Sequence, residues 1–265
     1  MRLKIRINKA LLNFLLLVSL IVGLLAGTAI LFHNSITSPL VAVSSPTPTA
    51  IASPVANEFQ YMLTSQVNNT QTRGNRPRYE VQAVDPSNYG ERYTRDVNGV
   101  PLHNRSIIVL HETSFSAASA INLFQTPHTD EKVQASYHSL IKLDGTIVYL
   151  VPPEKRAFGA GNSVFETKQG IETVKTNQHL PPSVNNFAYH VSLETPPQAE
   201  ESRTTHEGYT EAQYNSLAWL LSQSTVPDDR ITTHRAVDRS GLRIDPRSFD
   251  FQKFFNLLHT YRQRM

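Results

Sequence analysis

The chain has 265 residues, an ordinary hydrophobic share of 40% and no cysteine. This composition argues against wholesale disorder, and the length suits one sizeable domain better than two large ones. The absence of cysteine excludes disulfides and thiolate metal sites, which leaves His, Asp and Glu as the strong metal ligands. The formal net charge is +3, but residues 1–9 hold four basic side chains and no acid, so taking four from +3 leaves the remainder at −1. Because nucleic-acid binders usually keep a basic folded surface, we expect no nucleic-acid partner.

Residues 10–32 form a long apolar run without a charged side chain, directly after the basic start. About 20 apolar residues suffice to cross a bilayer core, and a positive flank places the preceding end on the cytoplasmic side. A cleaved signal peptide is the alternative, although its apolar region usually spans only about 7–15 residues. We therefore predict a cytoplasmic stub and a transmembrane signal anchor over residues 1–34. Under either interpretation, the rest of the chain is expected to be exported from the cytoplasm.

Two segments separate this apolar run from the first clear periodicity. Residues 35–58 are rich in Ser, Thr, Pro and Ala, which is typical of an extended linker. Residues 59–105 contain turn signals but little periodicity, so we interpret them as an N-terminal arm packed along the domain. This arm is also a candidate inhibitory segment. The domain itself is predicted to span residues 106–265.

Strand and helix patterns alternate within that domain. Short apolar or alternating runs predict strands, and apolar residues three to four positions apart predict helices. The predicted strands lie within residues 106–111, 138–150 (a hairpin around Asp144-Gly145) and 189–194. The predicted helices lie within residues 114–127, 209–223 (with a capping box of Thr210 and Gln213) and 249–261. Strands interleaved with helices predict an α/β domain with a central sheet.

Three residues of this domain combine into a candidate metal site. His111 ends a buried apolar run, and functional groups collect at strand ends in sheets that are covered on both faces. His234 ends a short β-branched run, and Asp245 follows across a loop that contains one glycine. Two imidazoles and a carboxylate can hold a catalytic zinc that keeps a fourth position for water. A hydrogen-bonded strand-end histidine and an ordinary turn at Asp245 are the alternatives.

Two further residues are candidates for proton transfer and charge stabilisation. Glu194 ends the strand 189–194 on its polar side and precedes a proline pair that breaks the strand, so we predict that it is the general base. Arg243 lies two residues before Asp245 and could direct a fixed positive charge at a developing oxyanion. An exposed strand carboxylate and a surface arginine are the alternatives.

Several ordered pieces of the chain carry a resemblance to a known family. From about residue 106 to 255 the chain resembles the zinc-dependent N-acetylmuramoyl-L-alanine amidases of the type 2 amidase and peptidoglycan recognition protein family. The matching pieces are IIVLHETS, SYHSLIKLDGTIVYLVP, AFGAGNS, NNFAYHVSLE, GYTEAQYNSLAWLL and ITTHRAVDRSGLRIDP followed by FDF. Each piece is modest, but the ordered set is highly specific.

The resemblance implies a mixed central sheet flanked by helices and a groove for a glycan–peptide substrate. It implies hydrolysis of the amide between the lactyl group of N-acetylmuramic acid and the L-alanine of the stem peptide. By motif position it also implies a role for each of the following residues: His111, His234 and Asp245 as ligands of Zn²⁺, Glu194, Arg243 and Tyr137 in catalysis, and His138, His190 and Asn186 along the substrate groove.

The chain departs from the family pattern at two positions. Arg243 stands where many members have lysine, and an arginine keeps the charge but cannot give up its proton. Gly159 stands where many members have the histidine of an H-A-G motif, so we expect a lost contact to substrate. His190 shares a strand face with Glu194 and is a candidate to point into the groove in its place.

The sequence therefore predicts a zinc amidase that is anchored in a bacterial inner membrane and acts on peptidoglycan from the periplasmic side. A secreted form after signal-peptide cleavage is the alternative localisation. A non-catalytic peptidoglycan-binding module is the alternative function. Recognition-only relatives typically lack the third metal ligand, and the presence of Asp245 favours the enzyme. An amidase for a different amide is a third interpretation, which the predicted anchor disfavours.

Overall fold

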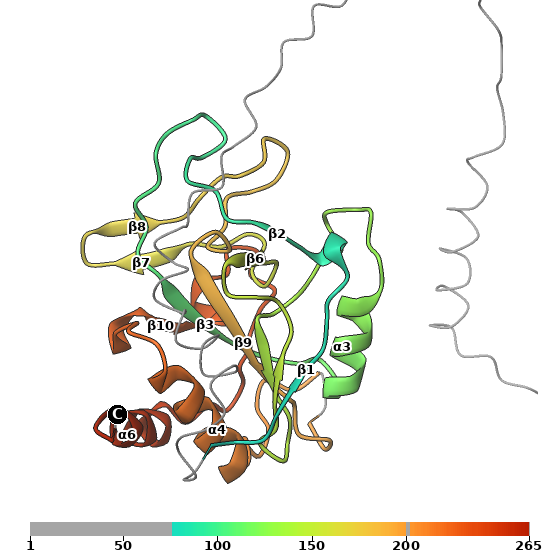
Figure 1. Ribbon diagram of the computed structural model, residues 1–265, viewed down its shortest axis with the longest axis vertical. Helices are drawn as coiled ribbons and strands as arrows, with labels where there is room; N and C mark the ends of the chain where they lie inside the picture. Colours follow the sequence, from blue (N-terminus) through green and yellow to red (C-terminus); the bar gives the residue numbers. More distant parts are fainter. Residues whose placement is uncertain (1–75, 200–201, 265) are drawn as a thin grey trace, which may run out of the picture. The chain divides into compact units, whose positions relative to one another are not determined.

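The computed structural model describes residues 76–199 and 202–264 (Figure 1). A six-stranded sheet lies at the centre of this part of the chain. In spatial order its strands are β1 (Tyr79–Val81), β5 (Ile147–Tyr149), β4 (Ser139–Ile141), β9 (Ala188–Leu193), β3 (Ile107–Glu112) and β10 (Ile231–Thr233). All neighbours are parallel except β4 and β5, which form an antiparallel hairpin. The sheet is therefore mixed, as the sequence predicted.

Smaller elements surround the sheet. The helices are α3 (Ala117–Gln125), α4 (Glu211–Ser222), α5 (His234–Val237) and α6 (Phe251–Arg262), and the 3-10 turns are η1 (Pro86–Asn88) and η2 (Asp228–Arg230). Two antiparallel strand pairs are β2 (Tyr89–Glu91) with β6 (Lys155–Ala157), and β7 (Phe165–Thr167) with β8 (Gly170–Glu172). The predicted hairpin turn is confirmed, with Gly145 at a φ of 81° that favours glycine.

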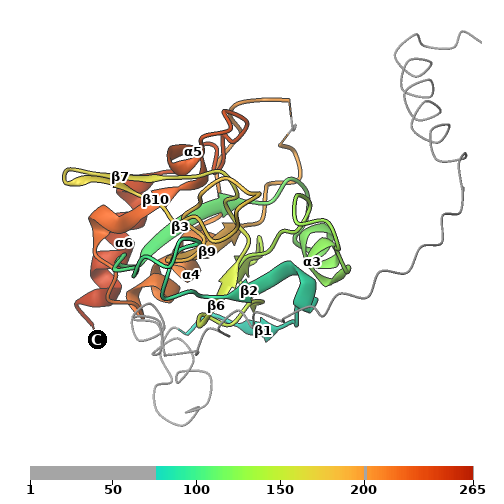
Figure 2. The same ribbon diagram turned by 90° about the horizontal axis from the view of Figure 1, so that it is seen from above.

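Helices cover both faces of the sheet (Figure 2). On one face, α4 and α6 place Leu217, Leu221 and Phe254 in a core that also contains apolar side chains of β3 and β9. On the other face, Ile121 and Phe124 of α3 pack in a separate core with Leu140 and Val148, among other residues. The strands β3 and β9 are buried along their whole length. Burial on both faces explains why β3 is an apolar run rather than an alternating one.

The described part of the sequence begins at residue 76. Among the described residues, no helix is long and apolar enough to span a bilayer. The predicted membrane segment 10–32 and linker 35–58 lie outside the described residues. Within the predicted arm 59–105, β1 pairs with β5 and forms an edge of the sheet. The sheet therefore begins before residue 106.

Candidate functional site

The topology brings the three predicted metal ligands together. β3 and β10 are parallel neighbours, and the pairing of Leu110 with Thr233 places His111 and His234 side by side at the carboxyl ends of their strands. The chain then returns from α5, and the main-chain N–H of Arg235 donates to the carbonyl of Asp245 over 2.9 Å. This contact holds Asp245 against the beginning of α5. The carboxyl edge of a parallel segment is where such sheets usually carry their sites.

One donor atom from each of the three residues lies within 4.8 Å of the other two. Nδ1 of His234 is 3.1 Å from Oδ2 of Asp245, and Nδ1 of His111 is 3.4 Å from the same oxygen. The two imidazole rings lie 4.6 Å apart and nearly edge to face. The two Nδ1 atoms and the carboxylate therefore converge on one point.

The chemistry of this cluster fits a metal ion. Nδ1 of His111 is buried and makes no hydrogen bond to any described residue, so a polar atom that normally needs a partner is left without one. Burial, and then the neighbouring His234, lower the pKa of His111 to about 4, which keeps the ring in its neutral, metal-binding form. Two imidazoles and one carboxylate match the ligand set of a hydrolytic zinc site with an open fourth position.

Asp245 supplies the negative charge of the cluster. Its burial alone would raise the pKa of the carboxyl group, but the adjacent rings of His111 and His234 outweigh this effect and hold the pKa well below its usual range. The carboxylate is therefore ionised at neutral pH. An ionised carboxylate beside two imidazole rings is a site for a cation.

His111 is buried directly behind His234 and Asp245, which line a cleft of about 1180 Å³. Its walls come from the β3–α3 connection, α3, the segments 131–137 and 156–162, the loop 176–185 and the segment 234–247. Apolar side chains such as Phe115, Leu123 and Leu242 are exposed along it beside charged residues. A cleft of mixed polarity and this size can hold an extended ligand with both apolar and ionic groups.

Tyr137 lines the cleft directly beside the cluster. Its ring stacks on the imidazole of His111 with centroids 4.6 Å apart, and the ring of Phe124 packs edge-on against its other side. Burial, and then the charge of Asp245, raise the pKa of Tyr137 well above its usual range. The phenol therefore stays protonated, and its hydroxyl can donate a hydrogen bond to a group in the cleft.

Arg243 also lines the cleft, on the loop that leads to Asp245. Its guanidinium makes no hydrogen bond or ion pair to any described residue, whereas its main-chain N–H donates to Asp238 over 3.3 Å. The carboxylate of Asp238 also accepts the N–H of Leu242 over 3.1 Å. The loop is thus held through its backbone while the charged side chain remains available to a ligand.

The structure places Glu194, which the sequence predicted as the general base, away from the cleft and in hydrogen bonds to two main-chain N–H groups. One carboxylate oxygen accepts the N–H of Ala117 over 2.7 Å, and the other accepts the N–H of Leu143 over 2.9 Å. Glu194 is not among the described residues that line the cleft. Glu194 follows the last residue of β9, and its side chain is directed to the N-terminus of α3 rather than to the cluster. The residue of β9 in register with His111 is Ser192.

The structure places the predicted groove residues His138 and Asn186 away from the cleft. Both are buried and neither lines the cleft within the described part of the chain. The amide of Asn186 bonds both the N–H and the carbonyl of Tyr93, which pins the N-terminal arm to the loop before β9. Nδ1 of His138 accepts the main-chain N–H of His190 over 2.9 Å. These two residues hold the scaffold together rather than face a ligand.

His190, the third predicted groove residue, is fully buried and likewise does not line the cleft. Its Nδ1 lies 2.9 Å from Nε2 of His111. The structure therefore does not place this side chain where it would touch a ligand in the cleft. The side chain instead forms a second layer behind a metal ligand.

A buried polar network beside the cluster has no local signal in the sequence. The carboxylate of Glu112 binds the guanidinium and the N–H of Arg247, the hydroxyl of Tyr209 over 2.5 Å and the imidazole of His206 over 3.2 Å. These partners come from distant parts of the chain, so no short motif connects them. Because Glu112 follows His111 and Arg247 follows Asp245 by two residues, the network clamps two ligand segments together.

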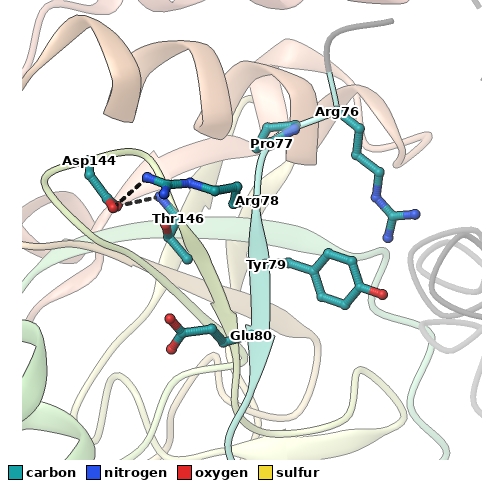
Figure 3. A pocket seen from close by; sticks show the side chains of 7 residues that line it. All are labelled: Arg76, Pro77, Arg78, Tyr79, Glu80, Asp144 and Thr146. Atoms are coloured by element: carbon teal, nitrogen blue, oxygen red, sulfur yellow. Dashed lines mark hydrogen bonds and ion pairs between the residues drawn. The ribbon is translucent and has the colours of Figure 1, made fainter. Parts of the chain in front are cut away.

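A separate shallow pocket lies at the opposite edge of the sheet, around β1 (Figure 3). Figure 3 shows Arg78 and Glu80 on one side of the strand and Tyr79 on the other, with the guanidinium of Arg78 bonded to Asp144 over 2.7 Å. The ion pair joins β1 to the β4–β5 turn. The pocket lacks the convergent metal-ligating atoms found beside the cleft, so we assign the catalytic site to the cleft.

Comparisons with known proteins agree with this location. The family model for N-acetylmuramoyl-L-alanine amidase matches residues 102–248, which is more than half of the chain. Comparison with curated protein sequences gave no significant match.

Similar solved structures include two of AmpD and one of AmpDh3. A selenomethionine derivative of AmpD is 25% identical over 68% of this chain and 94% of that chain, with a TM-score of 0.46. The solution structure of AmpD from Citrobacter freundii is 25% identical over 70% of this chain and 95% of that chain, with a TM-score of 0.42. AmpDh3 from Pseudomonas aeruginosa, solved with an anhydromuramic pentapeptide, is 20% identical over 62% of this chain and 66% of that chain, with a TM-score of 0.44.

The matched range contains the whole cluster and both side chains that face it from the cleft. His111, His234 and Asp245 lie within residues 102–248, as do Tyr137 and Arg243. The chain belongs to the type 2 N-acetylmuramoyl-L-alanine amidase family, and it is an enzyme of that class, an amidase of peptidoglycan.

Proposed function

We propose that the chain hydrolyses the amide between the lactyl group of N-acetylmuramic acid and the L-alanine of the stem peptide, and that this activity depends on zinc. The observation that carries the proposal is the convergence of His111, His234 and Asp245 at the wall of the cleft, with one buried nitrogen left unpartnered. A module that only recognises peptidoglycan has no use for three convergent ligand atoms. The family match adds the amide as the bond class.

The residues of the cluster would hold Zn²⁺ through Nδ1 of His111, Nδ1 of His234 and a carboxylate oxygen of Asp245. When bound, zinc supplies Lewis acidity toward water and toward the amide carbonyl. The stacked Tyr137 and the Glu112–Arg247 contact hold the ligand segments in place from two sides. Ligands held in this way lose little freedom when the metal binds.

Tyr137 and Arg243 are the side chains that we propose for charge stabilisation. The protonated hydroxyl of Tyr137 donates a hydrogen bond to the oxyanion that develops on the carbonyl, and Arg243 places a positive charge nearby. Neither group has to exchange a proton for this role. The proton-transfer role that the sequence suggested for Glu194 is not proposed again, since both of its oxygens are hydrogen-bonded elsewhere.

Digestion of purified sacculi tests the reaction. The full-length enzyme should release free stem peptides that begin with L-alanine, which mass spectrometry identifies by their mass. An Asp245→Ala variant should release none and should lose stoichiometric zinc in metal analysis. Intact muropeptides as the sole product, or full activity in a zinc-free preparation, would count against the proposal.

We also propose that residues 10–32 anchor the enzyme in a bacterial inner membrane, with the amidase domain on the periplasmic side. The support is the uncharged apolar run and its basic flank. Membrane fractionation and protease protection of the full-length protein test this. Recovery in the soluble fraction with a shortened N-terminus would indicate cleavage instead.

A further inference from the structure

The side chain of His190 has one hydrogen-bond partner among the described residues, and that partner is a metal-ligand ring. Nδ1 of His190 lies 2.9 Å from Nε2 of His111, and the ring centroids are 5.1 Å apart. Its other ring nitrogen, Nε2, is buried and has no partner in the described part of the chain. A fully buried imidazole that makes a single side-chain hydrogen bond is costly to keep. The contact with His111 therefore accounts for the presence of a histidine at this buried position.

Gly159 provides the space for this ring. A Cβ atom at position 159 would lie 2.5 Å from both Cγ and Nδ1 of His190, closer than side-chain carbons pack in proteins. The clashing atoms belong to the base of the ring, so the imidazole would have to turn away from His111. A side chain at position 159 and the observed ring at position 190 exclude each other. Gly159, at the position of the family's usual histidine, therefore leaves room that the ring of His190 fills.

We propose that His190 is a positioning residue for the metal centre, and that Gly159 is the glycine that permits it. Nδ1 of His190 accepts the Nε2–H of His111. A neutral imidazole carries one proton, so this bond places the free lone pair of His111 on Nδ1, the atom that faces Asp245. The contact fixes both the tautomer and the orientation of the first metal ligand. The inference rests on the proposed metal site and adds its second layer.

The surroundings of His190 keep its acceptor atom in place. The ring lies parallel to that of His138, with centroids 5.8 Å apart and planes 9° apart. Nδ1 of His138 accepts the main-chain N–H of His190 over 2.9 Å, and Nε2 of His138 lies 3.2 Å from both the carbonyl of Lys155 and the guanidinium of Arg92. The backbone of β9 and the β6 segment therefore share one chain of hydrogen bonds. The ring of His190 lies between the ring of His138 and the metal ligand His111.

Zinc affinity of the full-length protein tests the inference, measured by competition with a chromophoric chelator. Gly159→Ala should weaken zinc binding about 10-fold to 100-fold, the usual effect of losing such a partner. Gly161→Ala is the matched control, because a Cβ there meets nothing within 4 Å and its affinity should stay at the wild-type value. Thermal unfolding of each metal-free variant shows whether the fold itself has changed.

A second pair of variants separates hydrogen bonding from packing. His190→Asn keeps an acceptor oxygen close to the position of Nδ1 and should retain affinity within about 3-fold, whereas His190→Leu, of similar size, should lose it like Gly159→Ala. In the His190→Leu background, Gly159→Ala should add little further loss, because the two changes remove the same contact. If His190→Leu does not fold, two comparisons of zinc affinity still test the inference. One is Gly159→Ala against Gly161→Ala, and the other is His190→Asn against wild type.

The outcomes are distinct. Wild-type affinity in Gly159→Ala, or equal affinities in His190→Asn and His190→Leu, overturns the positioning role while the metal site stands. A wild-type protein that binds no zinc overturns the proposed metal site itself. Weaker binding in Gly159→Ala, with a metal-free unfolding temperature like that of Gly161→Ala, supports the inference.

Discussion

The carboxylate of Glu194 accepts the main-chain N–H of Ala117 at the first residue of α3, over a distance of 2.7 Å. The first N–H groups of a helix have no partner within the helix, and the helix dipole favours a negative charge at that end. Glu194 thereby joins the end of β9 to the beginning of α3. Its second oxygen bonds Leu143 in the β4–β5 turn over 2.9 Å. One side chain connects three elements of the fold.

Glu194→Gln should therefore lower stability rather than abolish catalysis. The amide can keep one acceptor oxygen but loses the charge, and we expect a loss of about 1–2 kcal/mol in the free energy of unfolding. Urea unfolding measures the loss. Glu211→Gln is the control: Glu211 also begins a helix but is exposed and pairs only with Lys253, so its effect should be smaller. Zinc binding and most of the activity should remain, and a variant as stable as wild type but inactive would restore the catalytic assignment.

Tyr137→Phe should lower turnover without removing the metal. The ring keeps its stacking on His111, so the ligand geometry is retained while the hydroxyl donor is lost. Loss of one oxyanion donor typically reduces kcat about 10²-fold to 10³-fold. Release of stem peptide from sacculi gives kcat, and metal analysis should find wild-type zinc content. If kcat is unchanged, the hydroxyl has no part in the chemistry.

Arg243 should act through its charge, so Arg243→Lys should cost less than Arg243→Ala. We expect about a 10-fold loss for lysine and about 10²-fold for alanine, since a lysine keeps the positive charge but not the planar donor set. The neighbouring Arg239 serves as a control because its side chain pairs with Glu166, and Arg239→Ala should leave kcat near wild type. Equal rates for the lysine and alanine variants would contradict an electrostatic role.

The metal-free protein should lose stability on mild acidification because of His111. Its pKa lies at about 4 instead of 6.5, first through burial and then through the neighbouring His234. Between these two values the unfolded chain binds a proton that the folded protein does not, so the stabilisation is complete above about 6.5 and is lost as pH falls to about 4. At about 1.4 kcal/mol per pKa unit, the loss is about 3 kcal/mol.

Urea unfolding in the presence of a chelator, at pH 7, 5.5 and 4, measures this dependence. Burial also lowers the pKa values of His138 and His190, so the wild-type curve contains their contributions as well. A His111→Gln variant isolates the share of His111, and its curve should be flatter by the amount expected above. Parallel curves for the two proteins would show that His111 does not carry the effect.

The convergence of His111 and His234 could be predicted from the sequence because strand ends are local features. A buried apolar run ends in His111 and a β-branched run ends in His234, so the pattern alone favours one edge of a parallel sheet for both residues. The surroundings of Glu194 could not be predicted in this way, although the strand that precedes it was predicted correctly. It lies one residue beyond the strand, and the helix that binds it begins 77 residues earlier in the chain.

Motif position was a poor guide to the groove for a different reason. His138 and Asn186 lie in segments that match the family, but their side chains bond the backbone of β9 and of the N-terminal arm. Only long-range packing decides whether a polar side chain at such a position faces the cleft or the interior. The same holds for Glu112 and Arg247, which meet across 135 residues.

The arm around Arg92 should be essential for folding, which bears on whether residues 59–105 could be a displaceable inhibitory segment. The buried guanidinium of Arg92 donates to the carbonyls of Pro153, Asn186 and Ala188 over 2.9–3.0 Å. Burial, and then the nearby Arg156, lower its pKa to about 9, so the group is charged at neutral pH without a carboxylate partner. The carbonyl oxygens of Pro153, before β6, and of Asn186 and Ala188, at the beginning of β9, therefore satisfy it.

Arg92→Leu should leave those buried carbonyls without donors, each at a cost of about 1–3 kcal/mol, and should lower the unfolding temperature strongly. Arg95→Ala is the matched control, because the exposed Arg95 donates only within its own turn, to the carbonyl of Gly99. An inhibitory arm predicts the opposite result, since loosening it would raise the rate of stem-peptide release in an intact domain. A more active and equally stable Arg92→Leu protein would therefore favour inhibition. A destabilised one shows that this part of the arm is a structural element of the amidase domain, continuous with the edge strand β1.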